Sequence, residues 1–394
     1  MASPLFLSIE QVLVMTKEKA KKAVSPAKGR VVVAMSGGVD SSVAAALLVE
    51  QGCEAVGISM QLWDYSEQGG GEGNGSGVAS TAGSCCSLDD LYDARRVCDK
   101  LGIPFYVANM EEVFKREVVD YFTGGYLGGE TPNPCVKCNE VMKFQALMQR
   151  AMESGADYLA TGHYARIEPP SDGADTYRLL KGRDPNKDQS YFLFTMTQGQ
   201  LAKTLFPVGD IRKDEVRRLA AKIGLKVAAK KESQEICFVE DDYGEFISQK
   251  VKGRAGDIVA AEGRVVGRHR GLFRYTIGQR RGLDIKDGSG PYYVLGTDME
   301  ANRLIVGKDA ELFSRGLICR EINWVSGAAP ESGEVTAKIR YRHEGVGATI
   351  DSLEHGRLKV LFKKTQRSVT PGQAVVFYDG DIVLGGGWIE RAIK

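Results

Sequence analysis

The sequence has no apolar run approaching the roughly 18 to 20 residues that span a membrane. It also has almost no net charge, because 52 Lys and Arg residues are balanced by 51 Asp and Glu residues, which leaves +1. A uniformly basic nucleic-acid coat is therefore excluded, although a local basic face is not. Eight cysteines among 394 residues are too few for a disulfide scaffold, so their positions matter more than their number.

The N-terminus lacks the features of a targeting signal. Residues 1–22 have no basic stretch ahead of their apolar residues, carry Glu10 and contain no arginine, so they resemble neither a secretory nor a transit peptide. Ser8 as an N-cap, with Ile9, Val12 and Leu13 on one face, instead predicts an appended helix within residues 1–28. These absences favour a cytoplasmic protein, in which thiols stay reduced unless they do chemistry or bind metal.

Three segments with different patterns follow this extension. Residues 29–245 alternate short β-branched runs with helical patterns, which predicts an α/β fold with a doubly wound parallel sheet and a ligand at the carboxyl ends of its strands. Short alternating strands and glycine turns predict a small β-rich domain over residues 246–290 and a C-terminal β-barrel over residues 291–394. Six glycines among residues 69–77 predict a surface loop that interrupts the first domain.

The segment from Ser36 to Ser42, SGGVDSS, lies between a predicted strand and a predicted helix. Its two glycines allow the backbone to approach a phosphate closely, and the amides and hydroxyls of a helix N-terminus can hold the anion. The Gly-Lys-Ser/Thr ending of a Walker A loop is missing, so the γ-phosphate enzymes with that loop are excluded. A tight turn with an Asp or Ser cap is the alternative, but the order of strand, loop and helix favours a phosphate site.

SGGVDSS resembles the pyrophosphate loop (PP-loop) of the N-type ATP pyrophosphatases, which cleave ATP to AMP and pyrophosphate and adenylate a substrate oxygen. Further motifs follow in the order seen in the tRNA-specific 2-thiouridylases, from about Arg30 to Ile389: TPNPCVKCNEVMKF, ATGHYAR, GRDPNKDQSYFL, LFPVGD, ESQEICFV, TIGQRRGL and TPGQAVVFYDGDIVLGGGWI. The resemblance implies an enzyme that uses ATP and Mg²⁺ to replace the C2 oxygen of a wobble uridine in tRNA with sulfur. It also implies a sulfur donor, either a cysteine desulfurase or a sulfur-carrier protein.

The resemblance further implies roles for individual residues. The ATP site would comprise Ala34, Met35, Ser36, Gly37, Gly38, Val39, Asp40, Ser41, Met60 and Gly162. The tRNA would contact Asn133, Pro134, Cys135, His163, Lys187, Asp188, Gln189, Arg340, Tyr341 and Gln373. Cys138 corresponds to the family's nucleophile and Cys237 to its persulfide carrier. The residues alone also fit simpler interpretations: a packing imidazole for His163, a solvated turn for residues 187–189 and a core cysteine for Cys237.

The cysteine motif departs from the family pattern, which has an Asp three residues before the nucleophile where this chain has Cys135. Three thiolates, from Cys135, Cys138 and Cys237, can hold a [4Fe–4S] cluster with one open iron, and a related group of tRNA thiolases uses such a cluster. A redox-active persulfide pair is a second alternative. Zinc is a third, although a structural zinc site wants a fourth ligand. Structural roles are favoured for Cys53, Cys85, Cys86, Cys98 and Cys319.

Basic residues are concentrated in the second half of the chain. Between Arg264 and Arg281 there are six arginines and His269 with no acid, interleaved with Phe273 and Tyr275. Two further basic stretches cover residues 338–342 and 359–367. Each alone fits a solvated face, but together they favour a surface that docks RNA.

Two other functions stay open. One is another ATP pyrophosphatase, such as a 4-thiouridine synthase or an amidotransferase-type ligase. The paired cysteine motifs and the β-rich C-terminal part argue against it. The other is a non-catalytic RNA-binding protein with a cysteine-held metal, against which the intact SGGVDSS loop argues.

Overall fold

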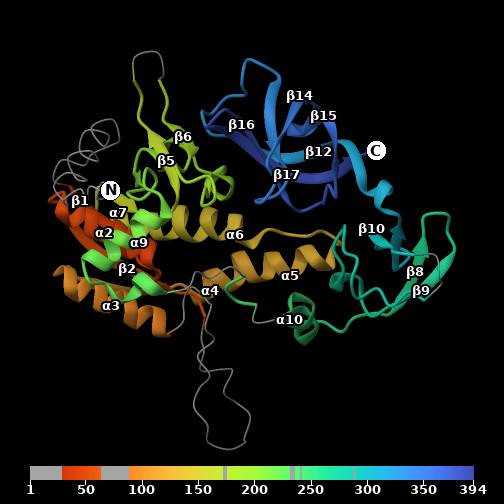
Figure 1. Cartoon of the computed structure of the whole chain (residues 1–394), viewed down its shortest axis with the longest axis horizontal. Helices are drawn as coiled ribbons and strands as arrows, with labels where there is room; N and C mark the ends of the chain where they lie inside the picture. Colours follow the sequence, from red (N-terminus) through yellow and green to blue (C-terminus); the bar gives the residue numbers. More distant parts are fainter. Residues whose placement is uncertain are drawn as a thin grey trace, which may run out of the picture.

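A computed structural model describes residues 29–63, 88–171, 175–230, 236–239, 242–286, 288 and 290–394. The predicted N-terminal helix, the glycine-rich stretch and the Cys85-Cys86 pair lie outside these residues. Three units follow one another along the described chain: an α/β unit, a small middle sheet and a C-terminal barrel (Figure 1). Every helix in these ranges is too short or too polar to be a candidate membrane span.

A five-stranded parallel sheet forms the centre of the α/β unit, in the order β3-β2-β1-β4-β7. Its strands are β1 (Arg30–Ala34), β2 (Glu54–Gln61), β3 (Phe105–Asn109), β4 (Tyr158–Ala160) and β7 (Thr204–Leu205). The β-branched run Val31, Val32 and Val33 is buried because helices cover both faces of the sheet. The strand order reverses between β1 and β4, which is where ligands bind in open α/β sheets.

Helices on the two faces of the sheet contribute to two apolar cores. One core takes in helices α2 (Val39–Glu50), α3 (Leu88–Leu101) and α9 (Lys213–Lys222). The other takes in α4 (Glu111–Phe114), η2 (Lys115–Val119), α6 (Pro134–Lys137), the π-helical η3 (Cys138–Leu147) and α7 (Met148–Glu153). The remaining helices of this unit are α5 (Asp120–Leu127), η4 (Ser190–Leu193), α8 (Gln198–Leu201) and η5 (Lys226–Ala229). The predicted doubly wound sheet is thus confirmed.

A closed barrel ends the chain, as the strand pattern predicted. Its strands follow the order β12-β15-β14-β13-β16-β17, and pairing of β12 with β17 closes it. They are β12 (Phe313–Trp324), β13 (Glu334–Lys338), β14 (Val346–Ser352), β15 (Leu358–Arg367), β16 (Ala374–Asp379) and β17 (Ile382–Ile393), with the short helices η7 (Asp309–Leu312) and η8 (Glu354–Gly356).

The middle unit is a four-stranded sheet in the order β10-β11-β8-β9. It contains α10 (Tyr243–Lys250), β8 (Gly256–Ala260), β9 (Val265–His269), η6 (Leu272–Arg274), β10 (Tyr293–Asp298) and β11 (Arg303–Gly307). Because β11 pairs with β8, this unit extends to residue 307, whereas the sequence pattern divided the chain after residue 290. The Gly and Pro residues near position 290 lie instead in the connection between β9 and β10 of this one sheet.

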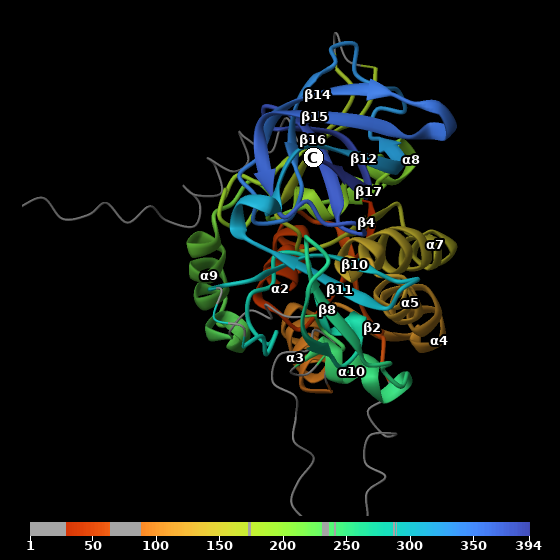
Figure 2. The ribbon, with the colours of Figure 1, turned by 90° about the vertical axis from the view of Figure 1, so that its right-hand side faces the viewer.

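The α/β unit and the barrel are joined through both backbone and core. A hairpin of the α/β unit, β5 (Ala165–Glu168) and β6 (Arg178–Lys181), extends the barrel sheet because β6 pairs with β17. One apolar core runs from Leu159 of β4 through Phe194 to Trp388 of the barrel. Gly386 is required there, since a Cβ atom would lie 2.7 Å from the Phe194 ring. The barrel therefore stacks firmly on the β4 side of the sheet (Figure 2).

Candidate nucleotide and cysteine site

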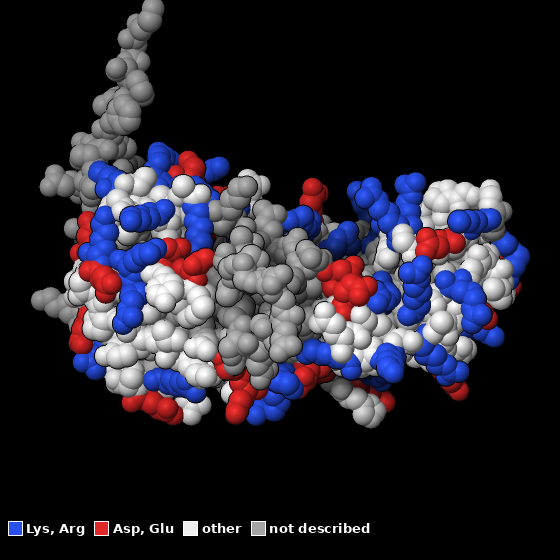
Figure 3. Space-filling model, turned by 90° about the horizontal axis from the view of Figure 1, so that it is seen from below, with Lys and Arg blue, Asp and Glu red and all other residues white. Residues whose placement is uncertain are grey.

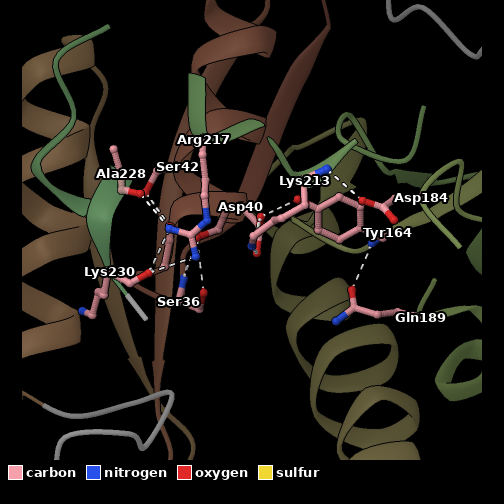
Figure 4. Close-up of polar contacts among 12 residues, drawn as sticks. Ser36, Asp40, Ser42, Tyr164, Asp184, Gln189, Lys213, Arg217, Ala228 and Lys230 are labelled. Carbon is pink, nitrogen blue, oxygen red and sulfur yellow. Dashed lines mark hydrogen bonds and ion pairs between the residues drawn. The ribbon is translucent and has the colours of Figure 1, made fainter. Parts of the chain in front are cut away.

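The SGGVDSS loop joins the carboxyl end of β1 to α2 (Figure 4). Gly37 has φ +68°, and a Cβ atom there would lie 2.3 Å from the carbonyl oxygen of Asp90 in α3. Within the described chain, no side chain caps the amino end of α2, where Gly38 is the N-cap. The amides of the first turn, with the hydroxyls of Ser36 and Ser41 beside them at 3.3 Å from one another, can therefore receive an anion.

The end of β4 lies directly against this loop. A Cβ atom on Gly162 would be 2.5 Å from the Ser41 nitrogen. The backbone that follows β4 therefore lies in direct contact with the backbone of α2, and only glycine fits at this position. Met60, at the end of β2, is half-buried and packs on the neighbouring core. The residues expected to bind ATP thus gather at the carboxyl ends of three adjacent strands.

Asp40 is held by two residues that the sequence analysis missed. Lys213 places Nζ 2.7 Å from both carboxylate oxygens, and the Tyr164 hydroxyl donates to Oδ1 at 2.7 Å (Figure 4). Lys213 is only 7% exposed, and its backbone N–H donates to Asp184. A lysine beside Asp214 and Glu215 in the first turn of a helix looks like a surface residue, so the sequence contained no signal for this role.

A second lysine connects the loop to the chain that leads to Cys237. Lys230 places Nζ 2.6 Å from carboxylate oxygens of Asp90 and Asp93, and 3.4 Å from the Gly37 carbonyl oxygen. Burial lowers the pKa of Lys230, but its hydrogen bonds to the two carboxylates outweigh burial and raise the pKa overall. Lys230 is therefore a charged anchor that joins three segments far apart in sequence.

The helix that carries Cys138 begins at a well-formed cap. The Asn133 side chain accepts the Val136 N–H at 3.3 Å, and Pro134 occupies the first turn, where its missing N–H costs nothing. Cys135 is exposed in this turn. Cys138 is half-buried one turn later and packs against the same apolar core as Cys237. No disulfide joins any of the six described cysteines.

The three cysteines do not fit a metal centre in this structure. All three belong to the described residues, and no three or more His, Cys, Asp or Glu side chains among those residues are grouped to hold a metal ion. Neither the [4Fe–4S] cluster nor the zinc alternative therefore has a preformed ligand set here.

Several residues that the resemblance assigned to tRNA face the protein interior. His163 is 8% exposed, with Nδ1 2.7 Å from the Thr161 hydroxyl and Nε2 3.4 Å from Lys143 Nζ. Burial, and then the charge of Lys143, hold the pKa of His163 well below its usual range. Asp188 is also 8% exposed, and its carboxylate accepts the backbone amides of Gly182 and Ser190. Lys187 beside it is half-buried.

The other assigned residues lie beside Tyr164, around the first turn of the Cys138 helix or on the barrel. The Gln189 side chain accepts the Tyr164 N–H at 3.0 Å. Arg340 is exposed, and the Tyr341 ring lies 4.5 Å from that of Phe192. Gln373 on the barrel donates from Nε2 to the carbonyl oxygen of Thr131 at 2.8 Å, and Thr131 lies two residues before Asn133.

The basic stretch of the middle unit forms an exposed face. Lys and Arg gather at the right-hand end of the molecule in Figure 3, which is the end that holds the middle unit in Figure 1. Arg268 near the end of β9 and Arg270 just after it are exposed, while His269 between them is 1% exposed. The exposed arginines of this face are Arg254, Arg264, Arg268, Arg270, Arg280 and Arg281.

Comparison with known proteins matches nearly all of the described chain. Family models match residues 29–241 (tRNA methyl transferase HUP domain), 244–308 (tRNA methyl transferase PRC-barrel domain) and 314–389 (aminomethyltransferase beta-barrel domain). The tRNA-specific 2-thiouridylase MnmA of Geobacter metallireducens is 55% identical over 95% of this chain and 99% of its own length. The tRNA-specific 2-thiouridylase MnmA of Geotalea uraniireducens is 55% identical over 93% of this chain and 96% of its own length.

A solved 4-thiouridine synthetase–RNA complex with bound ATP is 16% identical, with a TM-score of 0.35 over 57% of this chain and 50% of that one.

The buried His163 predicts a pH dependence of stability. Because its pKa is lowered on folding from 6.5, the unfolded chain takes up a proton below about pH 6.5 that the folded chain does not. The free energy of unfolding should therefore fall as the pH falls, by about 1.4 kcal/mol per pH unit from this residue. Urea unfolding at several pH values should give a shallower dependence for His163→Gln than for wild type. Equal dependences would contradict the buried, neutral imidazole.

Proposed function

The chain belongs to the tRNA-specific 2-thiouridylase family, and we propose that it uses ATP to replace the C2 oxygen of the wobble uridine in tRNA with sulfur. It is accordingly a tRNA-uridine 2-sulfurtransferase, and we propose the cytoplasm as its compartment. The observation that carries this function is the 55% identity to a relative of that name over 99% of the relative's length. The glycine-containing SGGVDSS loop, which lies where the strand order of the sheet reverses between β1 and β4, supports ATP as the activating substrate.

ATP makes the uridine oxygen a leaving group. An amide-like carbonyl oxygen leaves poorly, but after it attacks the α-phosphate and releases pyrophosphate it can leave as AMP. The first-turn amides of α2 and the hydroxyls of Ser36 and Ser41 are suited to hold the phosphates. Asp40 orients the Lys213 ammonium toward the same loop, where a fixed positive charge stabilises the charge that develops on pyrophosphate. We infer that Mg²⁺ arrives bound to the ATP phosphates.

Two cysteines then deliver the sulfur. A cysteine desulfurase or a sulfur-carrier protein loads Cys237 with a sulfane sulfur as a persulfide. The terminal sulfur attacks C2, forming a C–S bond, while the C–O bond breaks and AMP leaves. The Cys138 thiolate then attacks the Cys237 sulfur and breaks the S–S bond. This leaves the thiocarbonyl on the tRNA and a Cys138–Cys237 disulfide that a thiol reductant restores. Both cysteines are half-buried and contact the same apolar core.

A cluster-based route has no support from the arrangement of the residues. The described chain lacks a grouped set of three ligands, and Cys135 is exposed while the other two cysteines are half-buried. We therefore propose that Cys135 is not required for sulfur transfer. The alternative functions, a different ATP pyrophosphatase or a non-catalytic RNA-binding protein, are favoured by no particular observation.

Docking of the tRNA is assigned to the exposed arginines of the middle unit and to the barrel. An exposed arginine-rich face suits contact with the RNA backbone. The stacking role that the sequence suggested for Phe273 is wrong, because its ring is 6% exposed and packs in a core with Phe122 and Tyr126.

Asp40→Asn tests the nucleotide assignment. The amide keeps the shape of the side chain but loses the charge that holds Lys213, so tRNA-dependent AMP formation should fall by about 10² or more. Formation of AMP from labelled ATP in the presence of tRNA measures this rate. Asp214→Asn is the matched control, because Asp214 lies beside Lys213 but is exposed and pairs with Arg218. Wild-type AMP formation by Asp40→Asn would refute the assignment.

The cysteine route predicts different outcomes for three substitutions. Cys138→Ser and Cys237→Ser should each abolish thiolation but leave tRNA-dependent AMP formation measurable, whereas Cys135→Ser should retain thiolation. Nucleoside mass spectrometry of the tRNA gives the product, and iron is assayed in the same anaerobic preparations. Thiolation that appears only after iron and sulfide are added, and that needs Cys135, would overturn the persulfide route. Full thiolation by Cys237→Ser would remove its assigned role.

Replacing Arg268 and Arg270 together with glutamine should weaken tRNA binding. If each contacts one phosphate, the slope of log affinity against log salt should decrease by about one unit per lost contact. Filter binding over a range of salt concentrations measures both effects, and ATP binding should be unchanged. The same change at Arg95 and Arg96 of α3, which are also exposed, controls for net charge. Unchanged affinity and slope would show that the stretch is only solvated.

A further inference from the structure

A turn of the barrel is hydrogen-bonded to the segment that immediately precedes the Cys138 helix. The Thr131 N–H donates to the Pro371 carbonyl at 2.9 Å, and the Thr131 carbonyl accepts from Gln373 Nε2 at 2.8 Å. Both backbone groups of Thr131 are thus bound by one short turn, residues 370–373, which connects β15 to β16. Thr131 and Gln373 are 242 residues apart in the sequence.

Close approach at this contact requires glycine. Gly372 has φ +84°, and a Cβ atom there would lie 2.8 Å from the Glu130 Cβ and 2.9 Å from the Thr131 nitrogen. Any other residue would be strained in its own backbone and would push the segment away. The contact is therefore built into the backbone of both units rather than made by flexible side chains alone.

Further bonds tie the same segment to the barrel. Arg320 of β12 lies 2.9 Å from the Glu130 carboxylate. The fully buried Tyr191 donates its hydroxyl to the Ala374 carbonyl at 2.9 Å and is also hydrogen-bonded by the Asn133 side chain. Asn133 is the residue that caps the Cys138 helix. A continuous set of hydrogen bonds therefore leads from the barrel to the helix cap.

We propose that the 370–373 turn sets the position of Cys138, so that Gln373 and Gly372 are positioning residues that act through residues 130–134. This inference rests on the proposed role of Cys138 as a thiol of the reaction. It differs from a direct contact of Gln373 with tRNA, because its amide nitrogen is already used within the protein. The barrel then does more than dock RNA: it holds the helix that presents the cysteine.

The test measures Cys138 in the full chain without tRNA. Gln373→Ala removes the hydrogen bond and the packing, and Gln373→Glu keeps the shape but loses the amide donor. Both should loosen the first turn and speed alkylation of Cys138 by iodoacetamide about fivefold, the effect of losing one ordinary hydrogen bond. Peptide mass spectrometry follows the modification. Gly372→Ala should have a larger effect, about tenfold or more, because it adds backbone strain.

Gln366→Ala is the matched control. The Gln366 side chain is hydrogen-bonded to His343 and to the Lys364 carbonyl, and both partners belong to the barrel. Its substitution should therefore leave the alkylation rate of Cys138 unchanged. In thiolation assays the Gln373 variants should lower kcat with little change in KM for tRNA. An unchanged or slower alkylation rate, with a raised KM, would overturn the proposal and make Gln373 a tRNA contact. If the Gln373 variants show faster alkylation but Cys138→Ser thiolates tRNA at the wild-type rate, the assigned role of Cys138 is refuted and the positioning of Cys138 by the turn is not.

Discussion

The close approach of Gly37, after β1, to α3 and of Gly162, after β4, to α2 is the constraint on which the candidate site depends. Gly37 cannot carry a side chain because α3 lies against it, and Gly162 cannot because α2 does. Three segments therefore converge on the first turn of α2 without side chains between them, and within the described chain no side chain caps this helix end. A larger residue at Gly37 would push α3 away from the loop, and one at Gly162 would push the chain after β4 away from α2.

Charged side chains stabilise this convergence from both sides. Lys213 reaches Asp40 from α9, and Lys230 reaches Asp90 and Asp93 of α3 from the chain that leads to Cys237. Lys213 is buried, so removal of Asp40 would leave an uncompensated charge, whereas Lys230 is half-buried and shares two carboxylates. The SGGVDSS loop is thus held by ion pairs and hydrogen bonds from α9 on one side and from Lys230 on the other.

The barrel is integrated with the α/β unit rather than tethered to it. Phe194 and Trp388 share a core, β6 pairs with β17, and the turn at Gly372 holds Thr131. These contacts join the surface assigned to RNA with the helix assigned to sulfur transfer. In such an arrangement, the proposed docking of tRNA on the barrel would be coupled to the position of Cys138.

Local patterns in the chain were sufficient for the α/β class, the barrel and the phosphate-type loop, because strand periodicity, helix caps and glycine turns act over a few residues. They were insufficient for the end of the middle unit at residue 307, since strand pairing, not the turn near residue 290, decides which sheet a strand joins. The Cys135-x-x-Cys138 spacing suggested a shared metal, but helical neighbours need not converge with Cys237, and here they differ in exposure. Lys213 and Gln373 acquired their partners only through packing between segments far apart in sequence, and burial of that kind leaves no local signature.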